Sequence, residues 1–240
     1  MMFNLKFHTM KKMMIIAAMM VAAVSANAQF EPGTFSIQPK LGSSISWLSN
    51  TPNIPIGDIG SKSIELDKSP IAGALIGVEA EYQLASKFSL AAGLNFSIQG
   101  SGWSDFDEKI GDTKIEIKDN KMNLSYINIP AVANVYLFKG FAIKAGVQVG
   151  FLVDANYEVT ATYRDDNIKQ NVTTKIDESF KDECKKVDLS IPMGVSYQFP
   201  TIPIVIDARY NLGLTNVSKD SEEKLKNNVI QVTVGYKFKL

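Results

Sequence analysis

The strongest constraint on the fold of this chain is the alternation of apolar and polar residues from Ser125 to Ala155. After the turn-forming pair Lys139-Gly140, apolar residues occupy every second position: Phe141, Ile143, Ala145, Val147, Val149, Phe151 and Val153. Successive side chains of a strand point to opposite faces, so this pattern predicts a strand with one apolar face. Both runs of the hairpin are longer than the ~5–6 residues of an ordinary strand and reach the ~9–11 that span a bilayer. The hairpin is typical of a membrane barrel.

Similar alternation recurs along the chain, giving eight segments in total. They are 35–48, 71–84, 88–99, the two runs of the 125–155 hairpin, 187–199, 202–214 and 228–240. Tight links near 85–87, 139–140 and 200–201 alternate with long polar links at 49–70, 100–121, 156–186 and 215–227. This alternation predicts an all-β protein, an eight-stranded antiparallel up-and-down transmembrane β-barrel with short periplasmic turns and long external loops.

A soluble barrel or sandwich would show the same period, with its apolar faces turned inward. The membrane barrel is favoured because the apolar parity, meaning the alternate positions of each strand that hold apolar residues, is almost free of polar side chains. Aromatic residues also gather near the ends joined by the tight links: Tyr82, Phe88, Phe141, Tyr197, Phe199 and Phe238. Pro130 interrupts the fourth segment, and because proline cannot donate to a strand ladder we expect a local bulge there.

The N-terminus has the order of a secretory signal peptide. Lys11-Lys12 precede an apolar run from Met13 to Val24, and Ala26-Asn27-Ala28 form a small-residue cleavage site. We expect residues 1–28 to be removed, with Met10 as the natural start, and residues 29–240 to form the barrel domain. Cleavage removes three lysines and no acidic residue, leaving 22 basic against 25 acidic residues and a net charge of −3. No basic surplus remains to bind nucleic acid.

The sequence offers no catalytic, cofactor-binding or metal-binding constellation. The single histidine, His8, lies in the segment expected to be removed, so hydrolysis with an imidazole base is excluded for the mature chain. The carboxylate pairs Asp165-Asp166 and Asp177-Glu178 lie among lysines in a long link and are interpreted as a solvated loop. Cys184, the only cysteine, lies in the same link, and we expect an exposed, dispensable thiol. The chain is therefore predicted to be a non-enzyme without a cofactor.

Charged residues on the predicted inward parity form the one candidate site, which we expect to be structural. Isolated charges in a narrow lumen are costly, whereas paired and hydrogen-bonded ones persist. Asp188, Lys237 and Lys239 share this parity. The predicted lumenal charge network consists of Lys40, Glu79, Glu81, Lys144, Asp207 and Arg209.

Tyr126-Ile-Asn-Ile-Pro130, followed by a short turn and a strand with Ala145-Gly146, resembles the PorT-like outer-membrane β-barrel family. The last strand, with Phe238 and Leu240, is similar to the signal read by the barrel-insertion machinery. The resemblance implies a small barrel in the bacterial cell outer membrane. Its partners would be outer-membrane lipid, the insertion machinery and, for some members, other envelope or secretion proteins.

Two functions remain open at this point. One is a closed, non-enzymatic scaffold that presents external loops for adhesion or for an envelope or secretion assembly. The other is a narrow channel for small solutes. Eight strands enclose an interior just wide enough for side chains to fill, which favours the scaffold.

Overall fold

The computed structural model describes residues 31–59, 62–110, 113–165, 170–220 and 224–240. The predicted signal peptide, residues 1–28, lies outside the described residues. Within these ranges the chain is built of strands, apart from one short 3-10 helix, η1 (Lys181–Glu183). No helix in the described ranges is long and apolar enough to cross a membrane.

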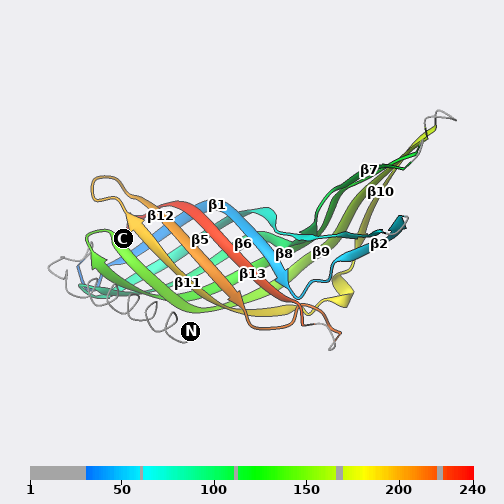
Figure 1. The fold of residues 1–240 in the computed structure, drawn as a ribbon. Helices are drawn as coiled ribbons and strands as arrows, with labels where there is room; N and C mark the ends of the chain where they lie inside the picture. Colours follow the sequence, from blue (N-terminus) through cyan, green and yellow to red (C-terminus); the bar gives the residue numbers. More distant parts are fainter. Residues whose placement is uncertain (1–30, 60–61, 111–112, 166–169, 221–223) are drawn as a thin grey trace, which may run out of the picture.

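Eight strands close into a ring, which we call the barrel (Figure 1). In order around the ring they are β1 (Phe35–Ser49), β5 (Ile71–Ala85), β6 (Phe88–Trp103), β8 (Thr113–Phe138), β9 (Phe141–Asp165), β11 (Val187–Gln198), β12 (Ile204–Gly213) and β13 (Lys226–Tyr236). Each strand is antiparallel to the next, and β13 pairs back with β1, so that Gly235 lies opposite Lys40. The predicted antiparallel, all-β ring of eight strands is confirmed, and all eight segments lie where the alternation places them.

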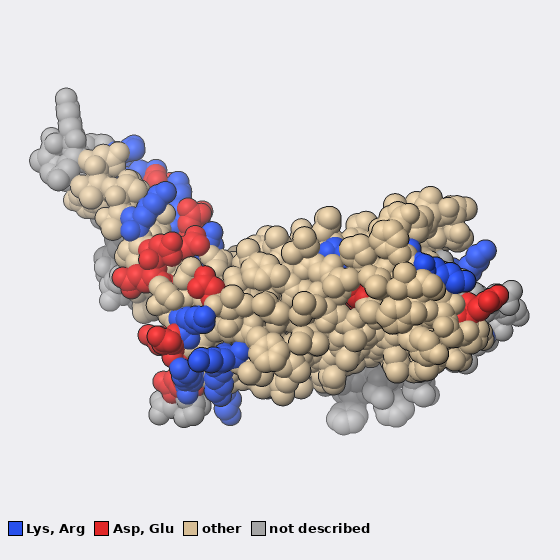
Figure 2. All heavy atoms as spheres, turned by 180° about the vertical axis from the view of Figure 1, so that it is seen from behind, with Lys and Arg blue, Asp and Glu red and all other residues tan. Residues whose placement is uncertain are grey.

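The apolar parity faces outward and the polar parity fills the interior. Leu41, Ile76 and Val147 are 63–66% exposed, whereas Ser89 and Asn134, on the opposite parity, are fully buried. The soluble alternative required the reverse orientation and is wrong for this chain. Figure 2 shows the same division, because the barrel wall is almost free of charged side chains between its two ends.

Two of the long links predicted as loops contain strands. β8 and β9 continue past the barrel as residues 113–121 and 156–165, flanked by β7 (Phe106–Ile110) and β10 (Gln170–Ser179). We call this four-stranded sheet the arm, and Figure 1 shows it projecting from the barrel end opposite the C-terminus. Its many charged residues favoured a loop, but Ile, Val, Thr and Tyr alternate with them, and such residues prefer strands.

The first long link also contains strands, although they lie beside the arm and outside the ring. These are β2 (Ile54–Ile59), β3 (Lys62–Leu66) and β4 (Lys68–Ser69), and β2 pairs with β3 to form a hairpin. At the opposite end, the last predicted strand is divided into β13 and β14 (Phe238–Lys239).

A bulge where the arm leaves the barrel reverses the faces of β9. Tyr126 pairs with Leu152 and Ser125 pairs with Asp154, so β9 carries one extra residue between the two pairs. Phe151 before the bulge points outward, whereas Ala155 after it is fully buried. Because one extra residue exchanges the two faces of a strand, the arm has a polar outer face and an apolar inner face, as in a soluble sheet.

The bulge predicted at Pro130 is not present. Pro130 pairs in regular register with Gln148 of β9. On its other side the ladder with β6 is interrupted, because pairing runs up to Ala92 and resumes at Asn95 without a change of register. The missing N–H of proline therefore removes ladder bonds without adding a residue to the strand.

Candidate functional site

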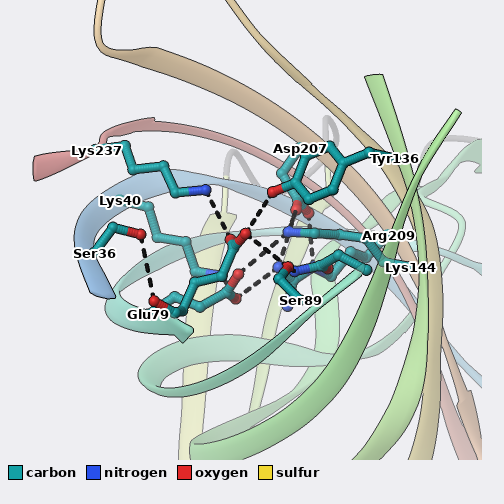
Figure 3. A network of polar contacts seen from close by, with 11 residues as sticks. Ser36, Lys40, Glu79, Ser89, Tyr136, Lys144, Asp207, Arg209 and Lys237 are labelled. Carbon is teal, nitrogen blue, oxygen red and sulfur yellow. Dashed lines mark hydrogen bonds and ion pairs between the residues drawn. The ribbon is translucent and has the colours of Figure 1, made fainter. Parts of the chain in front are cut away.

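The centre of the lumenal charge network is Glu79 of β5 (Figure 3). Its carboxylate accepts hydrogen bonds from Lys40 Nζ at 2.8 Å, Lys144 Nζ at 3.2 Å and Arg209 Nη2 at 2.6 Å. Asp207 accepts from Lys144 Nζ at 2.6 Å and from Arg209 Nε at 2.7 Å. All five side chains are only 2–4% exposed. Five of the six residues named from the sequence thus lie in one network contributed by β1, β5, β9 and β12.

The sixth residue, Glu81, forms a second group beside the first. It accepts hydrogen bonds from Lys237 Nζ at 2.8 Å and Ser89 Oγ at 2.7 Å, and from the hydroxyl of Tyr136. Ser89 and Tyr136 were missed because the sequence search collected only charged residues, although both stand on the inward parity. Lys239, expected to point inward, is exposed near the end of the last strand, where it pairs with Ser36.

The two groups together hold four cations and three carboxylates. The cations are Lys40, Lys144, Arg209 and Lys237. Each of the six oxygens of Glu79, Glu81 and Asp207 accepts at least one hydrogen bond. Every carboxylate oxygen is thus bonded to a side chain of the barrel itself, so the arrangement is suited to holding strands together. The described residues also contain no group of three or more His, Cys, Asp or Glu side chains placed to hold a metal ion.

Neutral polar side chains fill the next layer of the lumen. The Asn128 amide donates to Asn95 at 3.2 Å and to Ser97 at 2.9 Å, while Gln148 donates to Asn128 at 3.3 Å and to Ser190 at 3.2 Å. A β-carbon at Gly77 would lie 2.5 Å from the β-carbon of Asn95, so glycine is required there for the layer to pack. These side chains join four successive strands of the ring, β6, β8, β9 and β11.

An apolar cluster closes the lumen at the end next to the arm. Its buried members are Leu48, Leu124, Tyr126, Leu152, Ala155, Cys184 and Val217. Cys184 is 3% exposed, and its backbone forms an isolated antiparallel β-bridge with Ser218. The expectation of an exposed thiol is therefore wrong. Its charged neighbours in sequence indicated a solvated segment, but an extended chain can bury one side chain and expose those beside it. Asp188, also predicted inward, lies near this cluster and accepts a hydrogen bond from Thr215.

The burial of Cys184 predicts a thiol that does not react in the folded protein. Burial raises the pKa of Cys184 to about 11, so the reactive thiolate is scarce at neutral pH as well as shielded. We expect a maleimide reagent to leave the folded barrel unlabelled and to label the urea-unfolded chain fully. Lys185→Cys, at an exposed neighbouring position, is the matched control and should react at once. Rapid labelling of the native chain at Cys184 would contradict the burial.

Three of the four carboxylates read as a solvated loop belong to strands of the arm. Asp177 and Glu178 belong to β10, where both are exposed, and Asp165 is the last residue of β9. Asp166 lies outside the described residues. Asp177 and Glu178 are therefore solvated, as expected, but the backbone that carries them is a strand.

Comparison with solved structures gives matches of low sequence identity. Ail, the attachment invasion locus protein of Yersinia pestis, is 13% identical over 86% of this chain and 99% of its own, with a TM-score of 0.40. Neisserial surface protein A is 12% identical over 85% and 97%, with a TM-score of 0.42. The outer membrane protease OmpT from Escherichia coli is 9% identical over 87% and 97%, with a TM-score of 0.33. No curated protein matches the sequence.

The family comparison covers most of the chain. The model of the outer membrane protein beta-barrel domain matches residues 27–219, which contain seven of the eight ring strands. This match agrees with the closed ring of strands and with its apolar outer wall. The chain therefore belongs to the outer membrane protein beta-barrel domain family, and its location is the bacterial outer membrane.

Proposed function

We propose that the barrel spans the outer membrane with its tight turns in the periplasm and the arm outside the cell. The outward side chains support this placement, because they change from apolar Ile127 and Phe151 to polar Ser125 and Asp154 at the base of the arm. Aromatic pairs at the opposite end suit an interfacial girdle: Phe138 with Phe141, Tyr197 with Phe199, and Tyr236 with Phe238.

Within that placement, the protein acts as a closed, non-enzymatic scaffold of PorT-like type that presents its arm for adhesion or for an envelope or secretion assembly. The observation that carries this proposal is the filled lumen: ion pairs at the turn end, amides in the middle and an apolar cluster at the arm end. Outer-membrane lipid and the barrel-insertion machinery are the expected partners of the wall. The ion-paired carboxylates and the expected removal of His8 with the signal peptide argue against a hydrolytic site.

The alternative function is a narrow channel for small solutes, and conductance distinguishes the two. We expect the refolded wild-type barrel to show no steady single-channel conductance in a planar bilayer, because charges of both signs bridge the lumen. Arg209→Ala, which removes one of the two side chains that link Glu79 to Asp207, should permit brief openings. The exposed Lys239→Ala is the control and should behave as wild type. A large, steady wild-type conductance would refute the closed scaffold and favour the channel.

A further inference from the structure

The outer edge of the arm is an open strand. β10 is at the end of the sheet, and among the described strands it pairs only with β9. Its pairing runs without a bulge over ten residues, it contains no proline, and every side chain from Asn171 to Ser179 is exposed. An edge of this kind carries a row of unpaired backbone N–H and C=O groups. Natural proteins block such an edge with a bulge, a proline, charged side chains or a covering segment, and of these β10 has only the charged side chains.

The inner, apolar face of the arm is covered only near the barrel. Near the barrel, its inner face packs in a cluster formed by Leu66, Trp103 and Phe106. Farther along β10, Val172 and Ile176 are 45% and 42% exposed, and Tyr163, which pairs with Val172, is 42% exposed. The apolar face thus continues uncovered up to the free edge. A strand added at that edge would extend the same face.

Two opposite charges stand on the polar face of β10, on either side of Ile176. Lys175 lies beside Thr160 of β9, and Asp177 lies beside Glu158, a residue of the same charge. No ion pair joins Lys175 or Asp177 to any other residue in the described part of the chain. A cation arriving on the open side of Asp177 would therefore be favoured.

We propose that the strand that pairs with β10 is β10 of a second copy of this chain. In an antiparallel pair centred on Ile176, the two Ile176 residues face each other. Lys175 of each copy then faces Asp177 of the other, which satisfies both charges by a single two-fold operation. The edge is self-complementary in this register.

Other registers match less well. A pair centred on Lys175 places two lysines opposite each other, and a pair centred on Thr174 sets Lys175 against Thr173 with no ion pair. A shift of one residue would place apolar residues of one copy beside polar residues of the other, because facing residues of an antiparallel pair share a face. Charge and face together therefore select Ile176 as the centre.

The geometry of the contact indicates where the second copy stands. An antiparallel two-fold pair brings the strands together from opposite directions, and the arm projects away from the barrel end (Figure 1). The two barrels then lie in facing membranes, so the contact joins one cell to another that carries the same protein. This inference rests on the proposed external placement of the arm and gives the adhesive function a partner.

Charge exchange between two vesicle populations tests the pairing. The full-length mature protein is refolded into phosphatidylcholine vesicles, and vesicle clustering is followed by light scattering and by energy transfer between two lipid dyes. Wild-type vesicles should cluster. Lys175→Glu places a glutamate opposite Asp177 and Asp177→Lys places two lysines opposite each other, so each variant alone should cluster about tenfold less.

The decisive mixture combines the two variants. Vesicles with Lys175→Glu should cluster with vesicles that carry Asp177→Lys, because every facing pair is again of opposite sign. Lys185→Glu, the same charge change at an exposed position outside the edge, should cluster as wild type. Unboiled gel migration confirms that each barrel is folded.

Three results would overturn the proposal: no clustering of wild-type vesicles, unchanged clustering of the single variants, or no recovery in the mixture. Clustering that required an added protein would assign the edge to a different partner and would also overturn it. The closed-scaffold function would survive each of these results, because it is judged separately by conductance. Ile176→Cys adds a second readout, since cysteines on the two-fold axis should form an intermolecular disulfide between vesicles.

Discussion

Replacement of Glu79 by alanine should lower the free energy of unfolding by ~3–5 kcal/mol, provided that the lumen around it is dry. Glu79 is 2% exposed and accepts hydrogen bonds from three cations contributed by three other strands. Its removal leaves Lys40 without a carboxylate partner and leaves Asp207 as the sole acceptor for Lys144 and Arg209. Water that entered the lumen would reduce the loss.

Urea unfolding in lipid vesicles, followed by tryptophan fluorescence, measures this loss. Glu178→Ala is the matched control, because it removes the same side chain from an exposed position on β10 and should leave the unfolding midpoint unchanged. If Glu79→Ala unfolded at the wild-type midpoint, the network would not contribute to stability and its role as the element that joins the strands would be wrong.

Arginine at Val147 should destabilise the barrel in a bilayer by ~2–4 kcal/mol if this position lies at the membrane midplane. Val147 is 63% exposed on the outer wall of β9, and Ala145, Val149 and the paired Ala131 make its surroundings on that face apolar. A guanidinium placed there must lose its hydration or thin the bilayer to reach water.

The matched control is arginine at Thr162, on the outer face of the same strand but beyond the bulge, where it faces Glu116 and Thr173 and no lysine. Because that segment is proposed to stand in water, Thr162→Arg should not lower the urea concentration at which the barrel unfolds. Equal losses for the two variants would show that the wall of β9 and the arm are in the same medium, which would refute the proposed placement of the membrane boundary.

Much of the fold could be read from the sequence because the barrel is governed by one local rule. Every second residue of a strand faces the same medium, so the positions of Leu41, Ile76 and Val147 on the outer wall follow from their parity. The same rule identified Lys40, Glu79 and Arg209 as inward residues. Which of these residues bond to one another depends on the stagger of four strands around a closed ring. No local sequence pattern contains that information.

The arm and Cys184 show where local reasoning fails. Charges in the 156–186 link suggested solvated loops, yet Asn171 and Asp177 lie in a strand, because β9 continues past the barrel and offers β10 a partner. The exposure of Cys184 was predicted from its charged neighbours in sequence. Its burial depends instead on Leu48, Leu124 and Val217, which come from three distant parts of the chain.

The sequence by itself determined the strand periods, the order of tight and long links, and which residues share a face, because these properties depend only on neighbours along the chain. Tertiary structure alone decided that β13 pairs with β1 and that a bulge after Leu152 exchanges the faces of β9 in the arm. It also decided that the carboxylate of Glu79 forms ion pairs with three cations. The physical reason is that ring closure and burial bring together groups far apart in the sequence. Each of those contacts is set by the stagger and packing of the whole barrel.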